Sequence, residues 1–394
     1  MNTGIISKIR SLSEKFSKRI ISFRRHLHKH PELSFQEYRT TEFITAKLSD
    51  LNLDSIKHPY ETGVVGLMKN GRGKCVALRA DIDALPIEEK TGLPFSSVNS
   101  GVMHACGHDA HSAMLYGAAL ILNEIRQHLK GSVKFIFQPA EEKNPGGASI
   151  LIKKGVLTNP EVDAIFGQHV LPGKPAGKVG FYKGVMMASQ DEIYITIKGK
   201  SGHAAKPHSA SDPVTISAEF ISSLQTIASR NINPYEPVVI SICSIHGGSA
   251  TNVIPGEVHL SGTVRALNGS VRKKIHSLIE QRLKGITSAH NATYSFKISE
   301  GYPELINSVR ETEFAESCAH DFFGKKNIFK GKRYMFAEDF SFYLEKVSGT
   351  FYWIGAGNTT GLHTPTINID EKILPSGAAF MAYLAYSYLS SAKK

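Results

Sequence analysis

The 394-residue chain has few of the residues that would assign it to an oxidising compartment or to a membrane. It contains only four cysteines, which are widely separated: Cys75, Cys106, Cys243 and Cys318. Small secreted proteins that depend on disulfides are much richer in cysteine, so a disulfide framework is not expected and a reducing, cytoplasmic location is. No apolar run reaches the roughly 20 residues that a membrane-spanning helix needs. A membrane protein is therefore not expected.

The chain also lacks a concentrated run of positive charge, although its net charge is +11. Lysine and arginine are scattered, and the densest run is residues 272–274. A nucleic-acid-binding surface combines a basic stripe with aromatic residues or with a known motif, and neither is present. The sequence therefore predicts no nucleic-acid partner, and the positive charge favours small anionic substrates only weakly.

What is present is the composition of a folded globular protein, with 41% hydrophobic and 21% charged residues. The basic, serine-rich residues 1–25 formally resemble an organelle transit peptide. However, Ile5, Ile9, Phe16 and Ile20 recur at helical spacing. We therefore expect an amphipathic helix that docks on the rest of the protein.

Short apolar runs alternate with helical patterns over much of the chain. Four of these runs are typical of buried strands: 75–80, 132–139, 162–167 and 350–355. Helical periodicity lies between them, as in the segment that follows Asp109, a residue placed to cap that helix. The alternation predicts an α/β fold with a doubly wound sheet, in which ligands bind beyond the carboxyl ends of the strands.

Residues 188–299 follow a different order of elements. Strand and helix patterns alternate there as βαββαβ, which is the order of a ferredoxin-like unit. We therefore expect a second domain at 188–299, inserted into an α/β domain that is formed by residues 1–187 and 300–394.

The stretch HACGHDAH, residues 104–111, places three histidines, one cysteine and one aspartate close together. Taken alone, it could be an ordinary histidine-rich turn. On an extended segment, Cys106 and His108 would project to the same side. Thiolate, imidazole and carboxylate together suit zinc, and also manganese, cobalt or nickel. A metal site is one of the two readings that the stretch leaves open.

A pair of glutamates, Glu141 and Glu142, follows the apolar run 132–139. Their side chains must point in different directions, so one can bind a metal while the other acts on a water. The set His26, His28 and His30 is not expected to bind those metals, because residues two apart on a helix diverge. The cysteines other than Cys106 are expected to pack in the core.

Several motifs together resemble the metal-dependent amidohydrolases of the M20 peptidase clan. The branch resembled is that of the N-acyl-amino-acid hydrolases, which includes hippurate hydrolases, N-acetyldiaminopimelate deacetylases and auxin-conjugate hydrolases. The motifs span nearly the whole chain, in order: RRHLHKHPELSFQE, ALRADIDALPI, MHACGHDAHSAMLYGAA, FIFQPAEE, GQHV, GKSGHAAKPH, ATNVIPGEVHLSGTVRA, AEDFSFY and GLHTP.

The resemblance implies a catalytic domain that binds two divalent ions and an inserted lid domain that often dimerises. The implied metal ligands are Cys106, His108, Glu142, His169 and His363, with Cys106 bridging the ions. Glu141 would be the general base. The resemblance also implies a homodimer formed through the lid.

Other residues of the motifs have different expected roles. In the lid, His203 would steady the oxyanion, in this clan often from the partner subunit, while Asn252 and Arg265 would bind the substrate and its α-carboxylate. The remaining polar residues of the site are interpreted as orienting or packing groups: Asp81, Asp83, His104, Asp109 and His111.

The predicted reaction is hydrolysis of the amide bond of N-acetyl- or N-benzoyl-type amino acids. A metal-bound water would attack the carbonyl carbon, with Glu141 as general base. One alternative is a dipeptidase or carboxypeptidase of the same clan. Another is a non-catalytic binding protein on this fold, which predicts loss of the base or the ligands; no such loss is visible in the motifs.

Overall fold

The structure is a computed structural model that describes residues 3–391, and these residues divide into two compact units. Unit 1 comprises residues 3–184, 306–332 and 339–391, and unit 2 comprises residues 185–305 and 333–338. The short segment 333–338 thus joins unit 2 although its neighbours in the chain belong to unit 1. The roles of catalytic domain and lid remain predictions for these parts.

Unit 1 is built on one eight-stranded sheet with the order β1-β2-β4-β3-β5-β16-β6-β15. The strands are β1 (Ser55–Lys57), β2 (Val64–Asn70), β3 (Lys74–Asp81), β4 (Gly131–Gln138), β5 (Ala164–Leu171), β6 (Val179–Phe181), β15 (Ile328–Lys330) and β16 (Gly349–Gly355). The four strands that the apolar runs predicted are the central ones, β4, β3, β5 and β16, and they run parallel. Antiparallel neighbours flank them, so the sheet is mixed. The predicted α/β class is confirmed.

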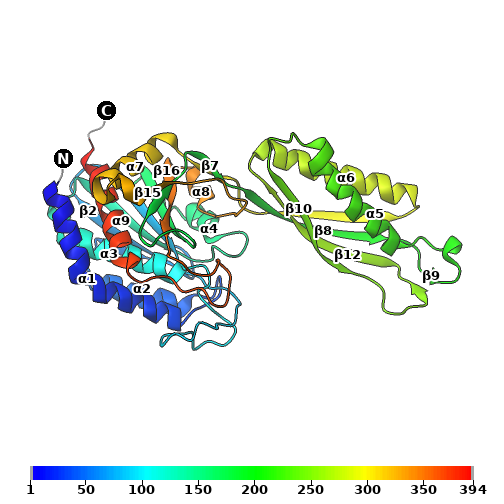
Figure 1. Ribbon diagram of the computed structural model, residues 1–394, viewed down its shortest axis with the longest axis horizontal. Helices are drawn as coiled ribbons and strands as arrows, with labels where there is room; N and C mark the ends of the chain where they lie inside the picture. The colour runs from blue at the N-terminus through cyan, green and yellow to red at the C-terminus, as the bar shows by residue number, and fades with distance from the viewer. Residues whose placement is uncertain (1–2, 392–394) are drawn as a thin grey trace. The chain divides into compact units, whose positions relative to one another are not determined.

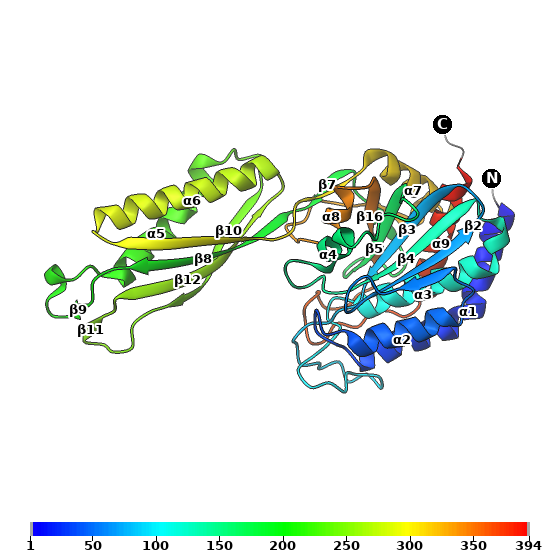
Figure 2. The ribbon, with the colours of Figure 1, turned by 180° about the vertical axis from the view of Figure 1, so that it is seen from behind.

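The long helices of unit 1 gather on one face of this sheet, where their apolar residues form one core cluster with the strands. Figures 1 and 2 show α1, α2 and α3 running along the sheet. The helices are α1 (Thr3–Lys29), α2 (Tyr38–Ser49), α3 (His108–Glu124), α4 (Gly147–Lys153), α7 (Val309–Phe323), α8 (Ser341–Leu344) and α9 (Ile373–Ser390), with short 3-10 turns at Arg126–His128 and Lys325–Asn327. On the other face, α4 contacts β4 and α8, and Phe340, directly before α8, contacts Phe351 of β16.

The amphipathic helix predicted near the N-terminus is α1. Its apolar stripe, which includes Ile9, Phe16 and Ile20, is buried in the core cluster, so the helix is docked as expected. Residues 1 and 2 lie outside the described part of the chain. The apolar run near the C-terminus forms α9. Among the described residues, no helix is both long enough and apolar enough to cross a membrane.

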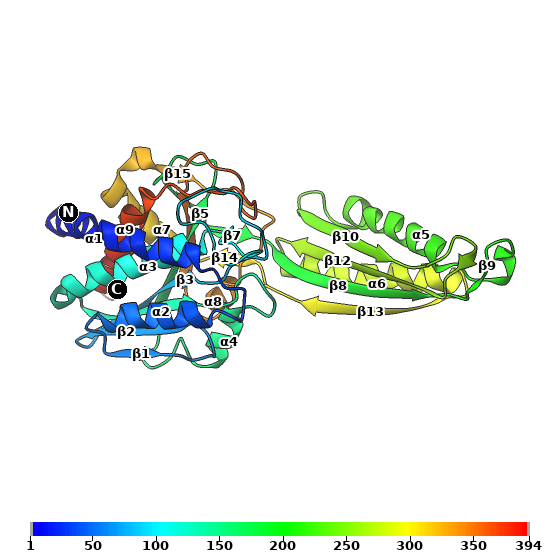
Figure 3. The same ribbon diagram turned by 90° about the horizontal axis from the view of Figure 1, so that it is seen from below.

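Unit 2 is a four-stranded antiparallel sheet with two helices on one face (Figures 1 and 3). Its elements follow the predicted order: β8 (Ser189–Lys198), α5 (Pro213–Thr226), β10 (Val238–His246), β12 (Glu257–Ala266), α6 (Gly269–Ala289) and β13 (Thr293–Glu300). The sheet order is β10-β12-β8-β13. Alternating residues of β8 are buried under the helices, which is the pattern of a strand with one covered face.

The shorter elements of unit 2 lie beside this sheet or where the chain passes between the units. They are β7 (Gly184–Met187), β9 (Gly202–His203), a 3-10 turn (Pro207–Ser209), a π-helical turn (Ile227–Asn231), β11 (Val253–Ile254) and β14 (Leu305–Asn307). Cys75 and Cys318 are buried in unit 1, as predicted. Cys243 is exposed, contrary to the prediction, because Val238, Ile240 and Ile242 of β10 pack against the core of unit 2 and the next residue, Cys243, points to the uncovered face of the sheet.

Candidate metal centre

The predicted metal ligands of unit 1 come from segments at the carboxyl ends of neighbouring strands. Glu141 and Glu142 follow β4, and His169 lies near the end of β5. Because β4, β3 and β5 are parallel, these ends share one edge of the sheet, which is where α/β sheets bind ligands. Cys106 and His108 lie at the start of α3, and His363 lies in the loop between β16 and α9.

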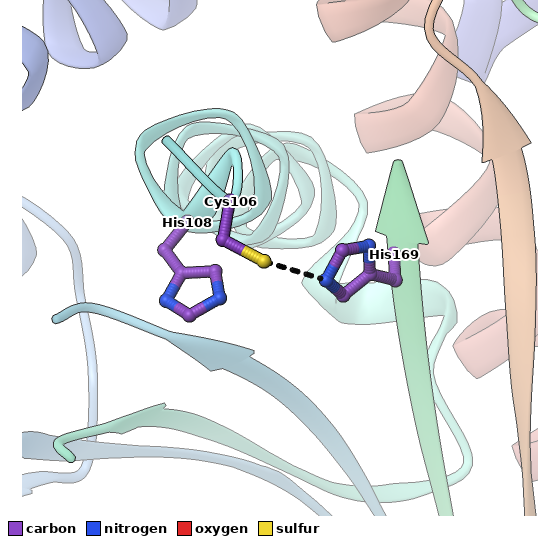
Figure 4. Close-up of side chains that lie close together, drawn as sticks. All are labelled: Cys106, His108 and His169. Carbon is purple, nitrogen blue, oxygen red and sulfur yellow. Dashed lines mark hydrogen bonds between the residues drawn. The ribbon is translucent and has the colours of Figure 1, made fainter. Parts of the chain in front are cut away.

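A tight turn brings Cys106 and His108 to this edge. Gly107 has φ +87°, and a Cβ atom there would stand only 2.6 Å from Cγ2 of Val170. Only glycine fits such a left-handed residue at so close an approach. The two predicted ligands therefore belong to a turn and a helix start, not to the extended segment that the spacing suggested. In Figure 4 the thiol of Cys106 points toward His169, and Sγ of Cys106 lies 3.5 Å from Nε2 of His169.

Two groups of potential ligand atoms share Cys106. The first group is Cys106, His108 and His169, and the second group is Cys106, Glu142 and His363. Within each group, the possible ligand atoms lie within 4.8 Å of one another. Oε1 of Glu142 is 3.2 Å from Nε2 of His363 and 3.8 Å from Nε2 of His108. Ligands of one ion at about 2.0–2.3 Å stand about 3–4 Å apart, so these separations suit shared ions.

Hydrogen bonds fix which nitrogen of each histidine faces the group. Nδ1 of His108 donates to Asp83, whose backbone and side-chain oxygens lie at 3.0 and 3.2 Å. Nδ1 of His169 donates to the backbone oxygen of Val170 at 2.7 Å. In the neutral form of both rings the proton is therefore on Nδ1, and Nε2 is the nitrogen that can bind a metal ion.

His111 also lies close to His108 and Asp81, but it cannot serve as a ligand in this arrangement. Its Nδ1 donates to Asp81 at 2.7 Å, and its Nε2 accepts the backbone N–H of Val170 at 2.9 Å. Both ring nitrogens are therefore engaged. Asp81 and Asp83 hold the rings of His111 and His108 in place, which is the orienting function expected of such residues.

Asp109 does not cap α3. It lies inside the first turn of that helix, whose N-cap is Gly107, and its carboxylate points inward. Oδ2 accepts hydrogen bonds from Arg24 at 2.9 Å and from Nδ1 of His28 at 2.8 Å. The prediction failed because these partners come from α1, far away in the sequence. His104 is buried as well, and neither of its ring nitrogens has a hydrogen-bond partner among the described residues.

The electrostatics of the group favour a bound cation. Burial, together with Glu142, Glu141 and Asp81, raises the pKa of the Cys106 thiol well above its usual range. Burial lowers the pKa of His108, but Asp81, Asp83 and Glu142 outweigh it and raise that pKa to about 10. A site that disfavours a thiolate and favours an imidazolium is rich in negative charge. A divalent ion would compensate that charge and stabilise the thiolate.

Two atoms of the group show that a metal ion fits the site. Nε2 of His108 and Oε1 of Glu142 are buried, and neither has a hydrogen-bond partner among the described residues. A buried polar atom without a partner is costly, and metal coordination removes that cost. The S, N and O donor set is the one that first-row divalent metals use. The residues therefore fit a metal ion.

The backbone around the group adopts uncommon conformations. Ala140, directly before Glu141, has φ 50°, and His363 has φ 59°. The N–H of Ala140 donates to Glu37 at 2.8 Å, and the N–H of His363 donates to the carbonyl of Ala105 at 2.8 Å. Left-handed conformations of non-glycine residues are strained, and they concentrate at functional sites.

A buried hydrogen-bond hub beneath the predicted ligands was not predicted from the sequence. Arg79, which is 1% exposed, donates to Oδ2 of Asp81 at 2.7 Å, Oε1 of Gln138 at 2.8 Å and Oδ1 of Asp339 at 2.7 Å. Asp339 also accepts the backbone N–H of Ala148 at 2.9 Å. The signal in the sequence was an arginine inside an apolar strand, because a buried guanidinium requires acceptors.

The three predicted substrate-contacting residues of unit 2 lie at two ends of its sheet. His203 in β9 and Asn252 before β11 are adjacent, since the N–H of Ala204 donates to the carbonyl of Asn252 at 3.0 Å. β9 lies beyond the carboxyl end of β8 (Figure 3). Arg265 pairs with Gln190, near the start of β8, and its Nη1 donates to the carbonyl of Met335 at 3.1 Å.

Comparisons with known proteins agree with this geometry. Residues 77–387 match the family described as Peptidase family M20/M25/M40. The N-acetylcysteine deacetylase of Bacillus subtilis (strain 168) is 40% identical over 380 residues, 96% of this chain and 99% of that protein. The thermostable carboxypeptidase 1 of Saccharolobus solfataricus is 36% identical over 395 residues, 98% of this chain and 99% of that protein.

A solved structure extends the likeness to the whole fold. It is a Bacillus subtilis protein described as a dinuclear metal binding peptidase from the M20 family, and it matches with a TM-score of 0.84 and 37% identity. The match covers 96% of this chain and 99% of that one. The chain therefore belongs to peptidase family M20/M25/M40 and is a metal-dependent amidohydrolase. The enzyme class that the motifs predicted is confirmed.

Proposed function

We propose that this enzyme hydrolyses the amide bond of N-acyl amino acids, with an N-acetyl or N-benzoyl group as the acyl part. The main support for this proposal is that five potential metal ligands lie close together at the carboxyl edge of the sheet, beside the buried Glu141. The name of the deacetylase relative supports the same class of substrate.

We assign Cys106, His108 and His169 to one divalent ion and Cys106, Glu142 and His363 to a second, with the Cys106 thiolate shared. Zinc, manganese, cobalt or nickel would suit these donors. Two such ions would polarise the carbonyl oxygen of the scissile amide and make a nearby water more acidic. A shared thiolate must stay reduced, so the assignment favours the cytoplasm as the location.

Glu141 is the proposed general base. It is buried next to Glu142, and one of its oxygens lies within 4.8 Å of ligand atoms of His108 and Glu142, but it belongs to neither of the two groups that share Cys106. Its carboxylate would take the proton of the attacking water and then donate it to the departing amino nitrogen. The hydrogen bond between Asp83 and the backbone N–H of Glu142, at 2.9 Å, holds this segment against the end of β3.

His203 and Asn252 are proposed to come from a second copy of the chain. Between the pairs Gln190–Arg265 and Lys198–Glu257, β8 rises about 27 Å, at about 3.4 Å per residue. Arg265 therefore lies far from His203 within one copy. A single N-acyl amino acid is too small to contact Arg265 and His203 of the same copy. In a homodimer formed through unit 2, Arg265 of one copy and His203 of the other copy could contact the same substrate.

The side chains of these residues suit their proposed roles. Nδ1 of His203 accepts the backbone N–H of Ala205 at 3.1 Å, so its proton sits on the exposed Nε2, where it can be donated to an oxyanion. Arg265 is half-buried and uses one nitrogen on Met335, which leaves other N–H groups for the α-carboxylate of the substrate.

A substrate panel tests the proposed function. Purified enzyme loaded with each candidate metal should release the amine from N-acetyl and N-benzoyl amino acids, and a chelator should abolish the release. Dipeptides with a free α-amino group should be poor substrates. If dipeptides or longer peptides react faster, the enzyme is a peptidase like the carboxypeptidase relative, the second candidate function. If neither N-acyl amino acids nor peptides react with any metal, the proposed substrate class is wrong.

A further inference from the structure

The three histidines near the end of α1 do not share one environment. His28 is buried, with Nδ1 2.8 Å from Asp109 and Nε2 3.2 Å from Glu89. His26 and His30 are exposed on the other side of the helix end. His28 is two residues from His26 and from His30, so it points to a different face of the helix. His26 and His30 are four residues apart and therefore share a face.

The rings of His26 and His30 lie side by side with free nitrogens. Their centroids are 4.9 Å apart, and neither ring makes a hydrogen bond to another described residue. A nitrogen bound at about 2.1 Å places its ring centre about 3.2 Å from the ion, so two rings at a tetrahedral angle stand about 5 Å apart. The observed separation fits two imidazoles on one ion.

The surroundings of His26 and His30 favour metal binding by these two rings. The ring of His26 stacks on Phe43 at 3.8 Å, which restricts its rotation. A cavity of about 410 Å³ adjoins both rings, and Glu32 and Asn99 line it as well. Burial, His30 and Lys47 lower the pKa of His26, so its ring is neutral and able to bind a metal at neutral pH.

Glu32 and Asn99 line the same cavity as the rings, and their oxygens have lone pairs that can accept further hydrogen bonds. The carboxylate of Glu32 accepts the backbone N–H groups of Arg39 and Thr40 at 3.2 and 2.8 Å, which fixes it at the start of α2. Nδ2 of Asn99 donates to the carbonyl of Pro31 at 2.8 Å. Through water, these oxygens can complete the coordination of an ion that two imidazoles hold.

We propose that His26 and His30 form a second, peripheral binding site for one divalent transition-metal ion, distinct from the candidate metal centre. Two nitrogen ligands and water make it weaker than the centre with its buried thiolate and carboxylate. Its affinity should follow the general order for nitrogen ligands, Mn²⁺ < Co²⁺ < Ni²⁺ < Cu²⁺. Lys47 and Arg39 nearby carry positive charge and weaken it further.

A titration of the loaded enzyme with Ni²⁺ tests the site. Enzyme whose catalytic ions are already bound should take up one additional Ni²⁺. His26→Ala or His30→Ala should weaken that uptake by about 100-fold, because linked ligands bind an ion far more tightly than single ones. The control His290→Ala removes an exposed histidine that pairs with Glu219, and it should change nothing. Hydrolytic activity should stay the same in all three variants.

Several results would overturn the site. They are the absence of additional Ni²⁺ in the unaltered enzyme, full uptake by His30→Ala, and loss of uptake in the control. His30 follows the last residue of α1 and is exposed, so His30→Ala remains decisive if His26→Ala disturbs the packing on Phe43. Electron paramagnetic resonance with Cu²⁺ should count two nitrogen ligands in the unaltered enzyme and one in each variant; equal counts would also contradict the proposal.

Discussion

At the scale of single residues, Glu141 and Glu142 are neighbours with different surroundings. Glu142 lies beside the ligand atoms of His108 and His363 and belongs to a group that shares Cys106. Glu141 also has an oxygen within 4.8 Å of His108, but it belongs to neither group that shares Cys106. We predict that Glu141→Gln keeps both ions but lowers kcat by about 100- to 10,000-fold, the range for loss of a general base. Glu142→Ala should instead lose metal. Metal content of the dialysed variants, measured with kcat, checks both expectations.

The same two measurements can contradict the assignment. If Glu141→Gln lost its metal and Glu142→Ala kept both ions, Glu141 would be the metal ligand and Glu142 the general base. Glu161→Gln is a matched control, since Glu161 is an exposed glutamate of unit 1 outside the site. It should leave both metal content and kcat unchanged.

Cys106 is the one residue common to both ligand groups, and this gives a second prediction at the residue scale. Serine in its place keeps the size of the side chain but does not supply a bridging thiolate. Two ions of like charge should then no longer be held close together. We expect Cys106→Ser to retain fewer than two ions per chain after dialysis. Two tightly held ions, counted by mass spectrometry of the native protein, would rule out the bridging role.

At the scale of elements, Arg79 connects β3, β4 and the segment that precedes α8. The acceptors Asp81, Gln138 and Asp339 are buried, so Arg79→Met would leave the carboxylates of Asp81 and Asp339 without this cation. Removing one partner of a buried pair costs about 3–5 kcal/mol. We expect this loss in the free energy of unfolding of unit 1, measured by urea denaturation with a chelator present.

The control for Arg79 is an arginine whose ion pair is exposed. Arg25 contacts Glu371, and its side chain is 49% exposed. Arg25→Met should cost less than about 1 kcal/mol, because solvent screens such pairs. Equal losses for the two variants would mean that the hub contributes no more than a surface pair.

Unit 2 has its own buried carboxylate. Asp191 accepts hydrogen bonds from Arg272 and His276, each at 2.7 Å. Burial raises its pKa, but these hydrogen bonds outweigh burial and lower the pKa to about 2. Because the folded pKa lies below the unfolded value of about 3.9, the stabilisation is present above pH 4 and disappears as the pH falls towards 2.

This gives a pH-dependent prediction for Asp191→Asn. The variant should be less stable than the unaltered enzyme at pH 6, by about 2 kcal/mol, and the difference should shrink as the pH falls from 4 towards 2. Thermal unfolding followed across this pH range measures it. A difference that stays constant with pH would show that the charge of Asp191 does not stabilise unit 2.

The elements also show what the sequence could predict. The central strands β3, β4, β5 and β16 were found because parallel strands buried on both faces appear as apolar runs. The three-residue strands β1, β6 and β15 carry no such pattern. The spacing of Cys106 and His108 predicted that they lie together. The turn at Gly107 that places them together could not be predicted, because it depends on a close approach to β5. The partners of Arg79 lie up to 260 residues away, and no local pattern shows them.

At the scale of the whole molecule, unit 2 places His203 and Arg265 at opposite ends of β8 and β12. If His203 acts on the site of a second copy, a dimer made of two different inactive variants should regain activity. Glu141→Gln lacks the base, and His203→Ala lacks the oxyanion donor, so each alone should be nearly inactive. In a hybrid dimer, one site combines an intact Glu141 with an intact His203 from the other subunit.

We therefore predict that hybrid dimers of Glu141→Gln and His203→Ala, co-expressed with two different affinity tags and purified through both, show about half of the activity of the unaltered dimer. If His203 instead serves the site of its own chain, both sites of the hybrid carry one defect and the hybrid stays inactive. A hybrid of Glu141→Gln with Cys106→Ser is the control. Both of these changes fall in the same centre, so neither chain of this control has an intact centre, and it should stay inactive however the subunits are paired. Activity in this control would show contamination with unaltered enzyme.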